Sequence, residues 1–159
     1  MTLRSTGTEG ARHARMLSPD ATSAHALVQS WLEARKDLAA DFPADWPADV
    51  WVVLVGDFPD LRLWAANSRN APEEIVRTLA RDEDWQIRSR IAERRGLPRD
   101  LFESMAQDPF ESVRKAIASN AKSPLEIVER LTRDPVDNVA RVAAYNLRER
   151  LAKQNKKKP

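Results

Sequence analysis

Cysteine is absent from this chain of 159 residues, and glycine occurs only four times. Without cysteine the protein has no disulfide, no thiol nucleophile and no thiolate ligand for a metal. The glycines are too scattered to form a phosphate-binding loop. No apolar run reaches the length of about 18 residues that a membrane span requires. We therefore expect a soluble, cytoplasmic protein with no membrane partner.

Histidine is also scarce, and neither His13 nor His25 has a metal-ligand partner at a suitable spacing. The serines further along the chain have no histidine nearby to activate them. The densest acidic cluster, residues 82–84, is better placed to cap a helix than to act as an acid–base pair. These shortages predict no catalytic residue, no metal site and no cofactor, and so a protein that is not an enzyme.

A phrase of about 26 residues repeats through the second two-thirds of the chain. Full copies begin at Asp82 and Asp108, and a last copy without the second proline begins at Asp134. A shortened copy begins at Asp57, and a half-copy begins at Pro47. Apolar residues recur in the same columns, among them Ile87, Val113 and Val139, and then Ile91, Ile117 and Ala143. One copy cannot bury such a stripe alone, so neighbouring copies must stack and share a core. The repeat predicts an all-α solenoid of about four two-helix copies.

Prolines indicate where the two helices of each copy begin. Asp108-Pro109 and Asp134-Pro135 place a capping side chain before a proline at the first helical position. Ser123-Pro124 has the same form for a second helix. Within that second helix, Glu126 and Arg130 are spaced for an i,i+4 ion pair.

The repeated phrase resembles the variant leucine-rich repeat, a mostly bacterial family. The match is clearest in one copy, at Asp108, Pro109, Val113, Arg114, Ala118, Asn120, Pro124, Ile127, Val128 and Leu131. The resemblance covers about two-thirds of the chain and implies a right-handed superhelix of alternating α- and 3₁₀-helices. Some members carry a cysteine-ligated iron–sulfur cluster, which cannot be transferred to a chain without cysteine. HEAT-like repeats, usually about 40 residues long, are the nearest alternative and fit the period less well.

The repeat divides the chain into four parts. Residues 1–20 are expected to be a flexible tail, and residues 21–46 a capping helix and its connector, with Ser23 capping a helix that ends near Ala40. The array spans residues 47–152. Its last copy lacks the second proline, which predicts a final helix that continues and closes the array. Residues 153–159 are expected to be a loose basic tail.

Arginine forms one candidate binding surface. Arg88 and Arg114 occupy the same column of successive copies, and stacking would align them. They could bind the phosphates of a nucleic acid, together with the lysines of the C-terminal tail. Alternatively, each could pair with an acid of an adjoining copy, such as the column of Asp82, Asp108 and Asp134. Residues 57–150 hold 17 basic and 17 acidic residues, and a short lysine run attracts nucleic acid only weakly.

Aromatic residues form the other candidate surface. Trp85 and Phe110 fall in the first turn of successive copies, with Val136 at the same place in the next. They could be an exposed ridge that binds a protein partner, with Trp64 beside them, or they could staple neighbouring copies together.

We expect a non-catalytic module that binds a protein partner through Trp64, Trp85, Phe110, Val136, Arg88 and Arg114. Nucleic-acid binding is the second hypothesis. The third hypothesis is a DNA-repair glycosylase built from helical repeats. Some such enzymes act with a tryptophan-lined groove and one carboxylate, an arrangement that Trp64 and Trp85 with an aspartate would imitate.

Overall fold

A computed structural model of the chain describes residues 19–34 and 41–156. In these two ranges the chain is all-helical and contains no strand. The helices are α2 (Pro19–Ala34), α3 (Ala48–Asp57), the 3₁₀-helix η2 (Pro59–Leu61), α4 (Arg62–Asn67), α5 (Glu73–Leu79), α6 (Trp85–Ala92), α7 (Arg99–Met105), α8 (Glu111–Ser119), α9 (Leu125–Leu131) and α10 (Asp137–Asn155). No helix among the described residues is both long enough and apolar enough to cross a bilayer.

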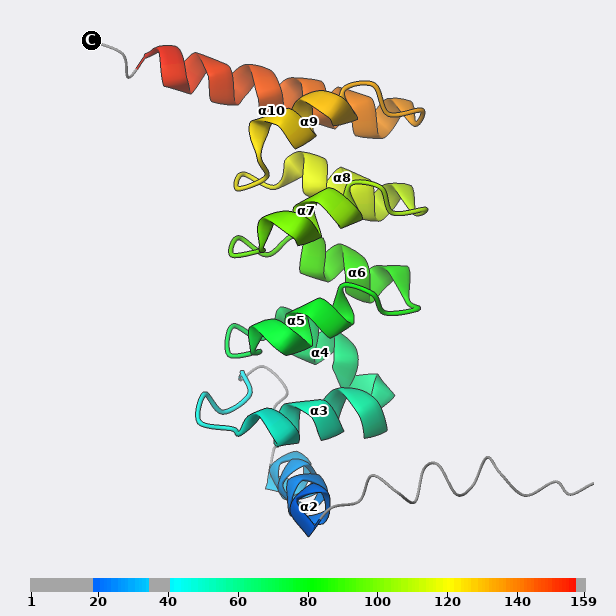
Figure 1. Cartoon of the computed structure of the whole chain (residues 1–159), viewed down its shortest axis with the longest axis vertical. Coiled ribbons are helices and arrows are strands. Elements are labelled where there is room, and N and C mark those ends of the chain that lie inside the picture. Colours follow the sequence, from blue (N-terminus) through cyan, green and yellow to red (C-terminus); the bar gives the residue numbers. More distant parts are fainter. Residues whose placement is uncertain (1–18, 35–40, 157–159) are drawn as a thin grey trace, which may run out of the picture.

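The helices are stacked along one long axis, from α2 at one end to α10 at the other (Figure 1). We call α4, α6, α8 and α10 the first helices, and α5, α7 and α9 the second helices. Each first helix packs on the next: α4 on α6, α6 on α8, and α8 on α10. Each second helix connects two first helices and covers one side of their layer (Figure 1).

Isoleucines and alanines of the first helices form the spine of the core. Ile91, Ile117 and Ala143 share a column in the sequence and are completely buried. The second helices add Leu101, Ile127 and other apolar side chains from their inner face. The columns that the sequence aligns are therefore core positions, because the same side of each copy faces its neighbours.

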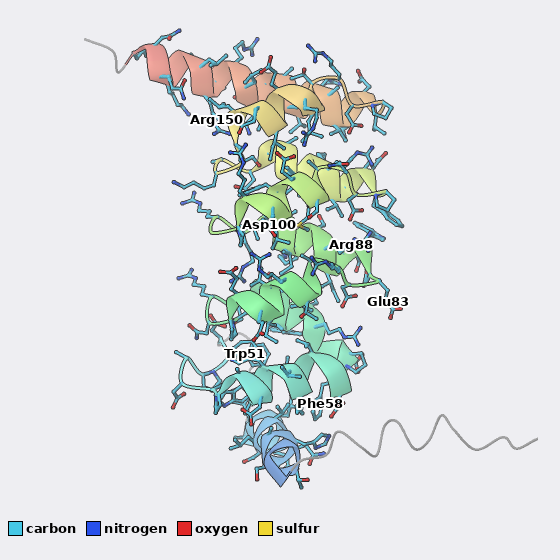
Figure 2. The ribbon with its side chains drawn as sticks, in the orientation of Figure 1. Trp51, Phe58, Glu83, Arg88, Asp100 and Arg150 are labelled. Carbon is cyan, nitrogen blue, oxygen red and sulfur yellow. The ribbon has the colours of Figure 1, made fainter. Side chains whose placement is uncertain are left out.

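An aromatic cluster joins α2 to the rest of the molecule. Trp51 is fully buried on α3 (Figure 2). Its ring lies 5.3 Å from that of Phe42 and 6.1 Å from that of Trp46, in edge-on geometry. Trp31 of α2 stacks on Phe42 with 4.5 Å between ring centroids, and it is half-buried rather than fully buried.

The second helices begin one residue later than predicted. Pro98 and Pro124 are N-cap residues with extended ψ angles of 149° and 137°, not the first helical residues. Each proline carbonyl still accepts the first hydrogen bond of its helix, from Phe102 at 3.3 Å and from Val128 at 3.2 Å. Ser123 does not cap α9, because its hydroxyl donates to the Ile117 carbonyl at 2.6 Å.

The first helices also begin later than the Asp-Pro pairs suggest. Asp108 accepts a hydrogen bond from the Phe110 N–H at 2.9 Å, which closes a turn ahead of α8. The helix then begins at Glu111, with Phe110 as its N-cap residue. Asp134 does the same for Val136 ahead of α10. The aspartates therefore stabilise the entry turn instead of capping the helix directly.

Three further predictions need correction. The N-terminal helix begins at Pro19 and includes Ser23 instead of being capped by it, and its predicted end near Ala40 lies outside the described residues. The expected alternation of α- and 3₁₀-helices was wrong, because α5, α7 and α9 are all α-helical and the 3₁₀-helix is η2. The last helix does continue, as predicted, but it reaches Asn155, so the first residues of the predicted tail 153–159 are helical. The predicted tail of residues 1–20 lies largely outside the described part.

A polar column links the ends of the first helices. The Asn120 amide donates to the carbonyls of Ala92 and Arg94, each at 2.8 Å, so it satisfies the end of the preceding first helix. Asn146 repeats the first of these bonds, to the Ala118 carbonyl at 2.6 Å. In the copy before, the position is Arg94, whose guanidinium donates to the equivalent carbonyls of Ala66 and Ser68. This role of the column was not predicted.

Arg94 is a charged group placed where its neighbouring copies use a neutral amide. Burial lowers the pKa of its guanidinium, and its hydrogen-bond acceptors are neutral carbonyls. We expect Arg94→Asn to raise the free energy of unfolding by about 0.5 to 2 kcal/mol, because it removes a poorly solvated charge and can keep both hydrogen bonds. Urea denaturation monitored by circular dichroism measures this change. The matched variant Asn120→Ala should lose about 1 to 3 kcal/mol, since it leaves two buried carbonyls without a donor; a loss of stability in both variants would contradict the explanation.

Candidate functional site

The predicted arginine column is a set of ion pairs that link adjoining copies. Arg88 on α6 forms a fork with Asp108, with Nε to Oδ2 at 2.7 Å and Nη2 to Oδ1 at 3.0 Å. Its remaining nitrogen, Nη1, donates to the carbonyls of Asp82 at 2.7 Å and Glu83 at 3.0 Å. Figure 2 shows Arg88 close to the loop that carries Glu83. Both side chains of the Arg88–Asp108 pair are buried.

The next copy repeats this arrangement. Arg114 forms the same fork with Asp134, at 2.7 Å and 3.0 Å, and donates to the carbonyls of Asp108 and Pro109. The hydrogen bond from Arg114 holds the pKa of Asp134 below its ordinary value, and the pKa of Arg114 is raised in turn. In the shortened copy, Arg62 lies 3.5 Å from Asp82. We call these pairs the Arg–Asp ladder.

The ladder uses the hydrogen-bonding capacity of Arg88 and Arg114 inside the molecule. Of the two alternatives that the sequence left open, the geometry favours ion pairing over a phosphate-reading column. A ligand could reach these guanidinium groups only by displacing buried carboxylates. Both arginines therefore support the candidate binding surface and are not part of it.

Trp85 and Phe110 form an aromatic pair above the ladder. Their rings are nearly parallel, with centroids 6.0 Å apart and an angle of 11° between planes. The Arg88 guanidinium lies 5.3 Å from the centre of the Phe110 ring. Phe110 remains 46% exposed, whereas Trp85 is half-buried against the core. The pair therefore connects two copies, as the staple alternative predicts, and also leaves an aromatic face exposed.

The other two apolar candidates occupy different surroundings. Val136 is half-buried and packs against the core as the N-cap residue of α10. Trp64 lies on α4 and is 39% exposed. We define the aromatic edge by Trp85 and Phe110 alone, because these are the two whose rings touch.

The surface of the second helices is covered by ion pairs that cross from helix to helix. Arg77 of α5 forks onto Asp100 of α7, at 2.6 Å and 3.3 Å. Arg99 pairs with Glu126, and Arg130 pairs with Glu103 at 2.6 Å. Glu126 and Arg130 thus bind partners on α7 rather than each other, contrary to the intrahelical pair predicted from their spacing.

The exposed side of the first helices is hollowed and less paired. A hollow of about 570 Å³ lies between α6 and α8. It is lined by Ser89, Glu93, Arg95, Ser112, Lys115, Ala116, Ser119, Asn120 and Ala121. A second hollow, of about 660 Å³, lies on α10 and is lined by Asn138, Arg141, Val142, Ala144, Tyr145 and Arg148. Sequence reasoning missed both hollows. The small residues that line the first, Ser89, Ser112, Ala116 and Ser119, can be seen in the sequence, but the packing of their helices cannot.

The described residues contain no group of three or more histidine, cysteine or acidic side chains that could hold a metal. His25 lies against the ring of Phe58, with centroids 4.7 Å apart, and His13 is outside the described part. Asp84 accepts a hydrogen bond from the Gln86 N–H at 2.8 Å and so caps α6, as expected for the acidic cluster 82–84.

In comparisons with known proteins, no protein-family model, no curated protein and no solved structure matches this chain.

Proposed function

We propose that this chain is a non-catalytic binding or scaffolding module that recognises a protein partner. We further propose that it is built as a right-handed α-solenoid of about four two-helix repeats, similar to the variant leucine-rich repeat, and that it works in the cytoplasm. The regular stacking of first helices supports the solenoid. The Arg–Asp ladder, repeated at a constant sequence separation, supports equivalent repeats.

The aromatic edge is the observation that carries the proposed function. Aromatic side chains dominate the energetics of protein interfaces, above all where they are rigid before binding. Phe110 is nearly half exposed, yet its ring contacts both Trp85 and the Arg88 guanidinium, and Arg88 is itself held by Asp108. A partner that covers Phe110 would therefore bury apolar area without ordering a flexible side chain.

Binding to an identified partner tests the proposal. Proteins retained by the immobilised chain are identified by mass spectrometry, and the strongest candidate is purified and titrated by isothermal calorimetry. We expect Phe110→Ala to weaken its binding by a factor of roughly 30, the loss of an interface hot spot. The control is Val52→Ala, which truncates an exposed apolar residue on α3 and should leave the affinity unchanged.

Stability measurements separate the two roles of the aromatic edge. An exposed binding residue can be truncated with little loss of folding free energy, whereas a staple between copies cannot. If Phe110→Ala binds the partner with normal affinity but lowers the free energy of unfolding strongly, the aromatic edge is structural and the proposed site is wrong.

A further inference from the structure

Two cations in the hollow between α6 and α8 have no acidic partner in the described part of the chain. Lys115 of α8 and Arg95, in the loop after α6, both line this hollow, and neither forms an ion pair there. The acidic residue of the lining, Glu93, is paired with Arg90 at 2.6 Å. The hollow therefore presents positive charge that the protein does not neutralise within it.

The hollow on α10 continues this pattern one copy later. Arg141 occupies the column of Lys115, and Arg148 lies two turns further along α10. The Arg148 guanidinium lies 5.7 Å from the ring centre of Tyr145, which is 61% exposed. Arg141 is only loosely paired, at 3.7 Å from Asp137, and both of these side chains are largely exposed. We call Arg95, Lys115, Arg141 and Arg148 the basic face.

The opposite side of the molecule is built differently. The cations of the second helices, Arg77, Arg99 and Arg130, each bind an acid of a neighbouring helix. The four cations of the basic face, in contrast, form no ion pair with a described residue that is closer than the loose one between Arg141 and Asp137. Its serine hydroxyls and small side chains leave room for a ligand to approach the helices closely.

We propose that the basic face binds an acidic, extended peptide segment of the partner protein. This inference rests on the proposed function and names the kind of partner. Each of the copies that begin at Asp82, Asp108 and Asp134 contributes at least one of these cations. Packed helices lie about 8 to 10 Å apart. A polyproline II segment advances about 9 Å in three residues, so a carboxylate at every third position would meet one copy after another. The two hollows would hold successive turns of the segment.

The composition of the basic face favours a peptide over single-stranded nucleic acid. Proteins that bind single strands use aromatic side chains as stacking platforms for successive bases. Tyr145 is the one aromatic residue that lines either hollow, and it is already covered on one side by Arg148. Trp85 and Phe110 stack on each other elsewhere. Cationic side chains are thus repeated along this face, whereas aromatic side chains that could stack on bases are not.

Fluorescence anisotropy with defined probes tests this inference. The full chain is titrated against labelled (Glu-Pro-Pro)₄, against (Gln-Pro-Pro)₄ of equal length, and against a twelve-nucleotide oligo-dT, at about 50 and 200 mM salt. We expect the glutamate peptide to bind, the glutamine peptide to bind at least tenfold more weakly, and binding to fall at the higher salt concentration.

Charge-reversal variants locate the site. Lys115→Glu with Arg148→Glu should weaken binding of the glutamate peptide by about tenfold or more. The matched control, Arg81→Glu with Arg133→Glu, makes the same change in net charge at two exposed arginines outside both hollows and should keep the affinity. If charge reversal disturbs α8 or α10, the double variant Lys115→Gln with Arg148→Gln removes both charges without reversing them. Circular dichroism checks that each variant is folded.

Several outcomes would overturn the proposal. These are a glutamate peptide that does not bind, equal weakening in the control variant, and oligo-dT that binds more tightly and is lost with the same two residues. The last result would identify a nucleic-acid site instead. The inference can fail while the proposed function stands: if a purified protein partner loses affinity with Phe110→Ala but not with the Lys115 and Arg148 variants, the module binds protein through the aromatic edge, and the acidic-segment inference is wrong.

Discussion

Asp108→Ala should lower the free energy of unfolding by about 3 kcal/mol, because it leaves the buried guanidinium of Arg88 without its counter-charge. Asp108 accepts two hydrogen bonds from Arg88 and a third from the Phe110 N–H. Arg88 would keep the carbonyls of Asp82 and Glu83, which are neutral and cannot replace a carboxylate. Breaking one partner of a buried pair costs more than the pair itself contributes.

Two further substitutions make this prediction specific. Asp108→Asn keeps an acceptor for the Phe110 N–H and should lose less stability than the alanine variant. Arg130→Ala removes an ion pair at the surface, where Arg130 is half exposed, and should change stability by about 0 to 1 kcal/mol. The free energies come from urea denaturation at neutral pH. A similar small loss for Asp108→Ala and Arg130→Ala would show that the ladder adds little to stability.

Trp51→Ala should cost about 3 to 5 kcal/mol, and the loss should be local. Trp51 is completely buried, and its ring contacts those of Phe42 and Trp46. Truncating a large core aromatic leaves a cavity that the surrounding chain fills only in part. Because α2 packs mainly on α3, this cluster is part of the contact that attaches α2 to the other helices. In stacks where each unit contacts only its neighbours, one end can open while the other stays folded.

Hydrogen exchange measured by mass spectrometry shows which helices lose stability in Trp51→Ala. We expect amides of α2 and α3 to exchange faster in Trp51→Ala, while those of α8 and α10 keep their protection. Val52→Ala, on the exposed side of the same helix, should change neither region. Faster exchange throughout the chain would show instead that all the described helices unfold as one cooperative unit.

The sequence predicted the core better than it predicted the surface. Ile91, Ile117 and Ala143 could be grouped from the repeat alone, because a constant period puts equivalent side chains on the same side of each copy. The helices predicted to begin at a proline start one or two residues later, since the capping rules identify turn-forming residues but not which of two consecutive turns becomes helical. Pro124 is the N-cap residue of α9 and not its first helical residue. Asp108 closes a turn ahead of α8 and does not cap the helix directly.

The candidate site was predicted only in part, and the reason is geometric. The sequence placed Arg88 and an aspartate in repeating columns, but only side-chain reach decides whether the arginine meets Asp108 or faces solvent. Trp85 and Phe110 were likewise identified as neighbours, with their stacking unknown. The hollows beside Ser89 and Lys115 could not be derived, because the space above small residues depends on how closely two helices pack.

The polar links between copies also bear on how the chain folds. Arg88 reaches Asp108 across 20 residues, Arg114 reaches Asp134 across the same interval, and Asn120 reaches the Ala92 carbonyl across 28. The entropy lost in closing a loop grows only with the logarithm of its length, so each of these closures costs nearly the same. Contacts of this short range are typical of chains that fold quickly. Folding can therefore begin at any pair of adjoining copies and spread in both directions, with the Arg–Asp fork fixing the register of each newly added copy.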